Sequence, residues 1–201
     1  ARTQFLNSGG YAFLKQELVN LTKKYDSHVL CDLGCGEGYY TSGFQAEEKY
    51  GFDMSKEALK HASKNDPSTQ YAVASIFRLP LEDASCDTAV TCFAPFAKDE
   101  IERVLTQGGR FFFVSPGPKH LFELKQLIYD TPYENEMKDL ETTLVKEEEY
   151  FISNTFHCEK ENLISLFKMT PYYHRTRNED IDKINHQDGM DITAEFLIRV
   201  Y

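Results

Sequence analysis

The chain has 201 residues, the size of one domain at a prior of about 150 residues per domain. Hydrophobic residues make up 41% of it and aromatic residues 13%, so the chain can bury a core and is not intrinsically disordered. The net charge of −10 repels phosphate backbones, so an RNA partner would have to be held by a local basic patch or a separate module. We therefore expect one soluble domain over residues 1–201 that contacts nucleic acid only with such help.

Cysteine usage and apolar runs indicate the compartment. The five cysteines form no Cys-x-x-Cys pair, and their odd number argues against a disulfide framework, so we expect a reducing, cytoplasmic location. The longest apolar run, residues 111–114, is far shorter than the roughly 20 residues of a membrane span, so we expect no membrane partner. The first residue, Ala1, is not methionine, so we expect the chain to begin inside a longer gene product.

Helices and short apolar strands alternate through the first half of the chain. The spacing of Phe13, Leu14, Leu18 and Leu21 predicts a helix within an N-terminal helical segment over residues 1–24. The glycines before Tyr11 suggest that this segment is a movable lid. Three apolar runs that end at turn residues predict three buried strands. Helical spacing predicts a helix between the second and the third of these strands. These elements are strands at residues 28–32, 49–53 and 70–74 and a helix at residues 56–64.

The second half continues the pattern with strands at 86–93 and 110–115 and a helix at 98–105 closed by Gly108 and Gly109. A further helix follows Pro118, and the polar linker over residues 131–149 ends in three glutamates, which we interpret as a solvated face. The chain ends with a strand at 150–158, a helix and a strand at 192–201. The last strand alternates apolar and polar residues, which is typical of antiparallel pairing. The sequence thus predicts an α/β fold on a mostly parallel sheet.

A glycine-rich turn, Asp32-Leu-Gly-Cys-Gly-Glu-Gly38, closes the first predicted strand, and we expect a helix to open at Tyr39. Glycines let the backbone approach a ligand, and free N–H groups point outward at such a turn. The spacing fits a dinucleotide fingerprint poorly, because Tyr39 occupies the place of its third glycine. The carboxylates of Asp32 and Glu37 favour a ligand with an ammonium or sulfonium centre, such as S-adenosylmethionine. An ordinary tight turn is the alternative interpretation.

Asp53 ends the second predicted strand, where a carboxylate can accept hydrogen bonds from both ribose hydroxyls of an adenosine. A turn or cap role is the alternative for this residue. After the third strand, Ser75 and Ile76 lie where a small polar and an apolar residue could meet the adenine, with simple packing as the alternative.

Together these motifs resemble the class I S-adenosylmethionine-dependent methyltransferases over nearly the whole chain. That resemblance implies a Rossmann-like fold: a seven-stranded, mostly parallel sheet with an antiparallel C-terminal strand and helices on both faces. Four separated motifs resemble more narrowly the RlmA-type guanine-N1 methyltransferases of 23S ribosomal RNA. They are Cys31-Asp-Leu-Gly-Cys-Gly-Glu-Gly-Tyr-Tyr-Thr41, Gly51-Phe-Asp-Met-Ser-Lys56, Ser115-Pro-Gly-Pro-Lys-His-Leu-Phe-Glu-Leu-Lys-Gln-Leu-Ile-Tyr129 and Phe167-Lys-Met-Thr-Pro171.

The resemblance implies S-adenosylmethionine as cofactor, 23S ribosomal RNA as partner, and a homodimer. Relatives of this type carry an N-terminal zinc ribbon; this chain has no four-ligand Cys/His set, so we expect zinc only in a module before Ala1 and no metal site here. The stretch from Gly38 to Asp53 is shorter than in those relatives. The implied cofactor residues are Tyr11, Asp32, Gly34, Cys35, Gly36, Glu37, Gly38, Asp53, Met54, Ser75, Ile76, Ala94 and His120.

Methylation of guanine N1 requires that the ring nitrogen lose a proton, so a base should lie near the methyl group. His120, just beyond the fifth strand, is the first candidate and Glu123 the second, because ligands bind at the carboxyl ends of parallel strands. His120 could instead contact the cofactor carboxylate or cap a helix. Lys119 could neutralise a phosphate or that carboxylate.

Substrate contacts are predicted at two places. Relatives that methylate exocyclic amines carry Asn or Asp before Pro-Pro-Tyr at the end of the fourth strand. This chain has Phe93-Ala-Pro-Phe96 there and lacks that polar residue. We therefore expect Pro95 and Phe96 to contact the flipped guanine, and core packing is the alternative. The basic and aromatic residues near position 175 could touch RNA or cap a helix; they are Tyr172, Arg175 and Arg177.

The sequence therefore predicts methyl transfer from S-adenosylmethionine to guanine N1 in a 23S ribosomal RNA hairpin. A small-molecule methyltransferase is the alternative enzyme, because the Leu79-Pro-Leu-Glu-Asp83 stretch and the acidic charge also suit that class. A non-catalytic module that binds the cofactor or RNA is the alternative of another class.

Overall fold

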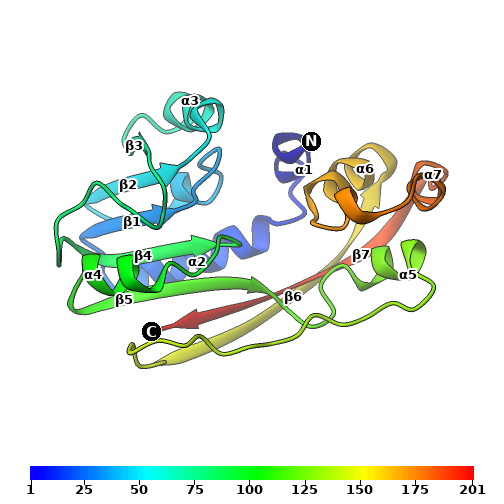
Figure 1. Cartoon of the computed structure of the whole chain (residues 1–201). Coiled ribbons are helices and arrows are strands. Elements are labelled where there is room, and N and C mark those ends of the chain that lie inside the picture. The colour runs from blue at the N-terminus through cyan, green and yellow to red at the C-terminus, as the bar shows by residue number, and fades with distance from the viewer. The chain divides into compact units, whose positions relative to one another are not determined.

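The computed structural model describes residues 1–201, and its strands form a seven-stranded sheet in the order β3-β2-β1-β4-β5-β7-β6 (Figure 1). The chain folds as two compact units. We call one the sheet unit; it comprises Leu14–Ser115, Lys138–Tyr150 and Leu197–Tyr201. We call the other the helical unit; it comprises Ala1–Phe13, Pro116–Met137 and Phe151–Phe196. None of the helices is both long and apolar enough to cross a membrane.

Parallel strands form the centre of the sheet unit. Strand β1 (Val29–Leu33) pairs in parallel with β2 (Glu48–Asp53) and β4 (Cys86–Cys92), and the outer pairs are β2 with β3 (Gln70–Val73) and β4 with β5 (Leu105–Pro116). Strands β1 and β4 are buried over nearly their whole length, as is typical of the central strands of a parallel sheet that is covered on both faces. Fully buried side chains of the sheet include Leu30, Cys31, Ala89 and Phe111. The predicted strands are confirmed.

Helices α2 (Ala12–Lys24), α3 (Lys56–Asn65) and α4 (Lys98–Val104) lie beside these strands (Figure 1). Helix α3 begins after Ser55, whose hydroxyl accepts a hydrogen bond from the Ala58 N–H, as an N-cap does. The prediction that Gly108 and Gly109 close α4 is wrong. The chain is already extended at Leu105, which pairs with Cys86, so both glycines lie within β5.

The helix predicted to open at Tyr39 is also absent. Its place is taken by a short 3₁₀ helix, η1 (Thr41–Gly43), after which the chain runs extended to β2. The physical reason is length, because the segment between Leu33 and Glu48 must complete the glycine turn and return to the start of the sheet. There the Glu48 N–H donates to the His28 carbonyl.

The C-terminal strand is antiparallel, as predicted. Tyr201 and Phe111 exchange N–H···O=C hydrogen bonds, both at 2.9 Å, which marks an antiparallel pair between the end of β7 (Gly189–Val200) and β5. The glutamates predicted to be a solvated face each bind a basic side chain within the sheet unit. Glu147 binds Arg110, Glu148 binds Lys24, and Glu149 binds the buried Arg199.

The helical unit contains α1 (Arg2–Asn7), α5 (Phe122–Ile128), α6 (Lys160–Met169), η2 (Tyr173–Arg175) and α7 (Asn178–Asn185), with parts of β6 (Glu148–Glu159) and β7. Helix α1 packs on α6, and α5 packs on α7. Strands β6 and β7 run antiparallel, and the hydroxyls of Thr155 and Thr193 meet across them at 3.0 Å. The N-terminal segment therefore holds two helices, α1 and α2, separated by Gly9 and Gly10, of which Gly9 has a φ of +89°.

A buried ion pair joins β2 to the turn before β3. Lys49 Nζ lies 2.9 Å from Asp66 Oδ2, and the two side chains are only 11% and 9% exposed. Burial raises the pKa of Asp66, but hydrogen bonds from Ser68 and Thr69 and the charge of Lys49 outweigh it and hold that pKa at about 2. Because the folded pKa lies below the unfolded one, Asp66 stabilises the fold above about pH 4 and loses that contribution as pH falls towards 2.

Replacing Lys49 with Met leaves the Asp66 carboxylate buried without its counter-ion. We expect Lys49→Met to lower the free energy of unfolding by about 3 to 5 kcal/mol at pH 7, measured by urea denaturation. The control is Lys60→Met, which removes an exposed pair with Glu57 and should cost about 1 kcal/mol or less. Equal losses in the two variants would contradict the role given to the buried pair.

Candidate active site

The glycine turn lies between β1 and η1 and has left-handed backbone at Gly34, Gly36 and Gly38, where φ is +83°, +56° and +73°. Two of these positions also exclude a side chain by contact. A Cβ on Gly34 would come within 2.8 Å of the Ala94 Cβ, and one on Gly38 within 2.7 Å of the Tyr71 hydroxyl. The turn is anchored to β2, because the N–H groups of Gly34 and Cys35 both donate to the carbonyl of Phe52. Glycine is therefore required here by conformation and by space.

Asp53 lies at the end of β2 with its carboxylate against the glycine turn. Its Oδ2 accepts a hydrogen bond from the Gly36 N–H at 2.9 Å, and its Oδ1 accepts one from the Ser55 N–H at 2.8 Å. Asp53 therefore does stabilise the turns around it, which was the alternative interpretation of this residue. Each carboxylate oxygen has a second lone pair, so the same group keeps acceptor capacity for ligand hydroxyls.

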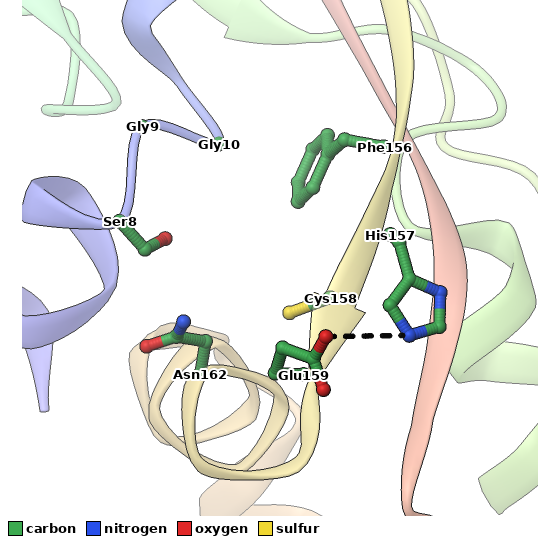
Figure 2. Close-up of a pocket in the computed structure, with 8 residues that line it drawn as sticks. All are labelled: Ser8, Gly9, Gly10, Phe156, His157, Cys158, Glu159 and Asn162. Atoms are coloured by element: carbon green, nitrogen blue, oxygen red, sulfur yellow. Dashed lines mark ion pairs between the residues drawn. The ribbon is translucent and has the colours of Figure 1, made fainter.

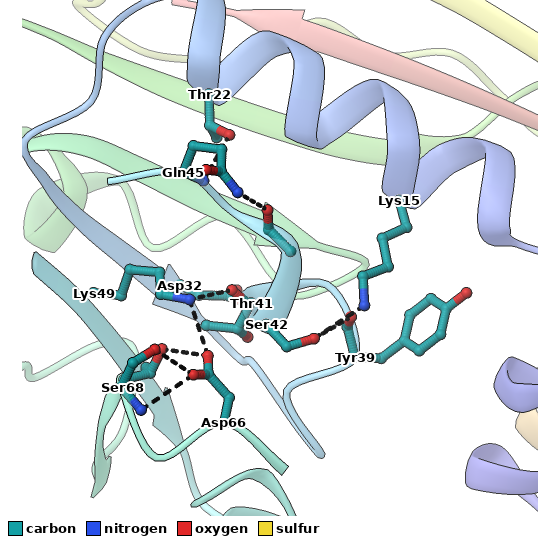
Figure 3. A network of polar contacts seen from close by, with 12 residues as sticks. Lys15, Thr22, Asp32, Tyr39, Thr41, Ser42, Gln45, Lys49, Asp66 and Ser68 are labelled. Carbon is teal, nitrogen blue, oxygen red and sulfur yellow. Dashed lines mark hydrogen bonds and ion pairs between the residues drawn. The ribbon is translucent and has the colours of Figure 1, made fainter. Parts of the chain in front are cut away.

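Asp32 lies beneath the turn and is 2% exposed. Its Oδ2 accepts a hydrogen bond from the Thr41 hydroxyl at 2.5 Å, and the Thr41 carbonyl accepts one from Lys49 Nζ at 3.3 Å (Figure 3). On the other side of η1, Lys15 Nζ donates to the Ser42 hydroxyl at 3.0 Å. These contacts fasten the short segment after the turn. The sequence pattern did not single out Thr41, Lys49 or Asp66, because isolated polar residues carry no spacing signal.

Large apolar side chains are exposed at the carboxyl ends of neighbouring strands. Met54 follows β2 and is 70% exposed, Phe77 follows β3 and is 61% exposed, and Phe93 follows β4 and is 39% exposed. Phe93 also has a φ of +65°, a conformation that costs energy for a bulky residue. Exposed apolar side chains along the ligand-binding edge of a parallel sheet suit the flat face of an adenine. Phe93 and Phe77 are site candidates that the sequence reasoning missed.

The other predicted adenine residues lie along the same edge. Ser75 accepts a hydrogen bond from the Phe77 N–H, and Ile76 is partly buried against the core. Ala94 faces Gly34. Of the two predicted guanine contacts, Phe96 stacks on the core ring of Phe111 with ring centroids 5.7 Å apart, as the alternative of core packing predicts. Pro95 beside it is exposed.

Tyr11 and His120 belong to the helical unit, where they contact each other. The Tyr11 hydroxyl lies 3.2 Å from His120 Nε2, and the two residues are 5% and 7% exposed. The Glu195 backbone N–H donates to His120 Nδ1 at 3.2 Å, so Nδ1 is an acceptor and the ring proton lies on Nε2. Burial lowers the pKa of His120 to about 4, so the ring is neutral at physiological pH. Both ring nitrogens are engaged, and His120 Nε2–H donates to the Tyr11 oxygen.

The second base candidate is held differently. Glu123 Oε2 accepts a hydrogen bond from the Thr193 N–H at 3.1 Å, which ties α5 to β7. Lys119 next to His120 is exposed, and its backbone N–H donates to Glu195 Oε2. Both assignments stay predictions.

The predicted RNA cluster is divided in the structure. Tyr172 is 9% exposed and packs edge-on against Tyr129, with Lys125 Nζ 5.4 Å from the centre of its ring. Arg177 precedes α7 and pairs with Asp180, which is the capping alternative. Arg175 is exposed on η2. In addition, no group of three or more His, Cys, Asp or Glu side chains is arranged to hold a metal ion.

Comparison with known proteins agrees with the fold and the candidate site. Residues 31–113 match the family described as methyltransferase domain. Two solved structures share the fold. The YcgJ protein of Bacillus subtilis has a TM-score of 0.57 at 17% identity, covering 92% of this chain and 97% of its own. Geranyl diphosphate methyltransferase has a TM-score of 0.54 at 13% identity, covering 93% and 83%.

The chain is also similar in sequence to relatives named for methylation of 23S ribosomal RNA. It is 34% identical over 133 residues to the 23S rRNA (guanine(748)-N(1))-methyltransferase of Streptomyces fradiae, covering 62% of this chain and 48% of the relative. It is 28% identical over 202 residues to a Bacillus subtilis (strain 168) protein provisionally named 23S rRNA (guanine-N(1)-)-methyltransferase YxjB, covering 89% and 68%. A malonyl-[acyl-carrier protein] O-methyltransferase of Hahella chejuensis is 28% identical over 139 residues, covering 63% and 50%. The chain thus spans about half of the Streptomyces and Hahella relatives.

The residues present fit S-adenosylmethionine. The turn has no side chain at Gly34, Gly36 and Gly38, so a ligand can approach its backbone closely, and the carboxylate of Asp53 beside it can accept hydroxyl hydrogens. When bound, the cofactor supplies a methyl group activated by a sulfonium centre. The acidic character of the turn complements that positive charge.

Replacing Asp53 with Ala tests this fit. Because hydrogen bonds to a charged group contribute about 1.5 to 3 kcal/mol, we expect Asp53→Ala to weaken the binding of S-adenosylmethionine by at least about tenfold in calorimetry. Glu57→Gln, a change of an exposed carboxylate on α3, is the control and should leave the affinity unchanged. Equal affinities for Asp53→Ala and the unsubstituted protein would remove Asp53 from the cofactor site.

Proposed function

We propose that this chain transfers the methyl group of S-adenosylmethionine to N1 of a guanine in a 23S ribosomal RNA hairpin. The observation that carries the proposal is the coincidence of a methyltransferase glycine turn and Asp53 with sequence similarity to relatives named for this reaction. The protein would act in the cytoplasm, and the zinc ribbon of RlmA-type proteins would supply the basic RNA contact that a chain of net charge −10 lacks.

The chain's part in this reaction is to position the reactants, exclude water and take up the N1 proton. In the sheet unit, the glycine turn and Asp53 would hold the cofactor, with Met54, Phe77 and Phe93 covering its adenine. In the helical unit, His120 would act as a positioning residue for Tyr11. Because His120 Nε2–H donates to the Tyr11 oxygen, the Tyr11 hydroxyl hydrogen is directed elsewhere and is available to a ligand.

Of the two base candidates, Glu123 would accept the proton. Its carboxylate has lone pairs beyond the single bond from Thr193, whereas both nitrogens of His120 are engaged. This assignment goes with the proposed reaction and depends on it.

The pH dependence of the reaction separates the two roles. Since the pKa of His120 is about 4, its ring stays neutral from about pH 5.5 to 8, and we expect His120→Asn to lower kcat without changing the shape of the pH profile in that range. Glu123→Gln should lower kcat by about 10²- to 10⁴-fold, as loss of a general base does. Loss of an ionisation near pH 6 to 7 in His120→Asn would make His120 the base.

Transfer of tritiated methyl groups to unmodified 23S ribosomal RNA tests the function directly, with the full-length protein. N1-methylguanine cannot form a Watson–Crick pair, so primer extension should stop at one guanine, and Asp53→Ala should abolish both the label and the stop. Label that appears only in a malonyl thioester supplied as competitor would favour the small-molecule alternative, which the Hahella relative supports. Cofactor binding with no transfer to either substrate would favour the non-catalytic module.

A further inference from the structure

A pocket of about 280 Å³ lies within the helical unit, between the chain that links α1 to α2 and the end of β6 (Figure 2). None of its residues belongs to the predicted cofactor or substrate set. Its volume is close to the lower end of the range for small-molecule sites, roughly 300 to 1,000 Å³. The pocket is lined by Ser8, Gly9, Gly10, Phe156, His157, Cys158, Glu159 and Asn162.

One wall of the pocket is flat and apolar. The ring of Phe156 projects from β6 into the pocket, and the thiol of Cys158 lies on the same side of the strand, while His157 points to the other face (Figure 2). Gly10 permits this arrangement, because a Cβ there would come within 2.8 Å of the Phe156 ring. Burial raises the pKa of Cys158 to about 11, so it remains a neutral thiol and not a thiolate nucleophile.

The polar groups of the pocket are acceptors and amides. The Asn162 side chain points from α6 towards the pocket (Figure 2). The Ser8 hydroxyl donates to the Phe5 carbonyl at 2.7 Å and keeps its lone pairs as acceptors. Glu159 is 75% exposed and lies 3.9 Å from His157 Nε2, whose other nitrogen binds Asp191 at 2.9 Å.

The charges of the lining residues indicate which kind of ligand the pocket can bind. No lysine or arginine lines the pocket, so it offers no permanent positive charge to a phosphate or a carboxylate, and the one basic side chain in its lining, His157, is bound to Asp191. An aromatic ring next to an amide and a carboxylate instead suits a flat ligand with N–H donors along one edge. Guanine carries two such donors, N1–H and the N2 amino group, beside the O6 acceptor, whereas uracil has one N–H donor between two acceptor oxygens.

We propose that this pocket receives a second guanine base of the RNA, not the one that is methylated, turned out of the stack with Phe156 against its face, Glu159 accepting from N1–H and N2–H, and Asn162 donating to O6. Unstacked bases are commonly held in this way, by an aromatic ring and by hydrogen bonds to the Watson–Crick edge. The inference rests on the proposed function, because it names the place on the helical unit where a base of the RNA substrate binds.

Nuclear magnetic resonance with guanosine as the probe tests the pocket without any methyl transfer. We expect guanosine to shift the Asn162 side-chain amide and the Gly10 backbone amide, and uridine to shift neither. Glu159→Gln should weaken guanosine binding by about fivefold or more, while Glu161→Gln, an exposed neighbour outside the pocket, should not. Absence of shifts at millimolar guanosine, or equal shifts with uridine, would overturn the proposal whatever the enzyme's substrate.

RNA methylation supplies the second measurement. We expect Phe156→Ala and Asn162→Ala to raise KM for the 23S fragment by about tenfold, with the affinity for S-adenosylmethionine unchanged; Phe151→Ala, an exposed aromatic on the same strand, is the control. Unchanged KM in an enzyme that does methylate the RNA would refute the pocket and leave the function intact. An unsubstituted protein that transfers no methyl to RNA would refute the function, and guanosine binding then decides on the pocket.

Discussion

The hydrogen bond from the Gly36 N–H to the Asp53 carboxylate is the constraint on which the site depends. It brings the glycine turn after β1 and the acidic end of β2 together, so that one group positions the backbone and presents acceptors to a ligand. Parallel pairing of β1 with β2 sets the register that makes this contact possible. We therefore expect a ligand that contacts the turn to contact Asp53 as well.

Buried polar contacts beneath the turn hold the short connection to β2, which contains no α-helix. Lys49 links Asp66 to the Thr41 carbonyl, and the Thr41 hydroxyl links onward to Asp32. Asp32, Thr41 and Asp66 are buried, and each of them hydrogen-bonds another polar group of this network, as buried polar groups must do to stabilise a fold. The geometry of the turn thus rests in part on these buried polar contacts.

Periodicity and glycine spacing predicted the sheet, the antiparallel last strand, the glycine turn and the place of Asp53 at the end of β2, because these depend on local pattern. The functional roles given to the site residues stay predictions. They failed where competing contacts decide the outcome. Leu105 left the helix before its glycines because it pairs with Cys86, and Tyr172 looked like a surface residue beside arginines but is buried against Tyr129. The tautomer of His120 depends on the backbone of Glu195, far along the chain, so no local pattern could predict it.

The three-residue η1 has one further consequence, for charge selection. A full helix starting at the turn would point the positive end of its macrodipole at the ligand and attract anions, whereas a single 3₁₀ turn contributes almost no such field. The carboxylates of Asp32, Glu37 and Asp53 then make the turn locally acidic, while Lys15 and Lys49 bind η1 beside it. We therefore expect the turn to favour a cationic adenosine derivative over a nucleotide with phosphates.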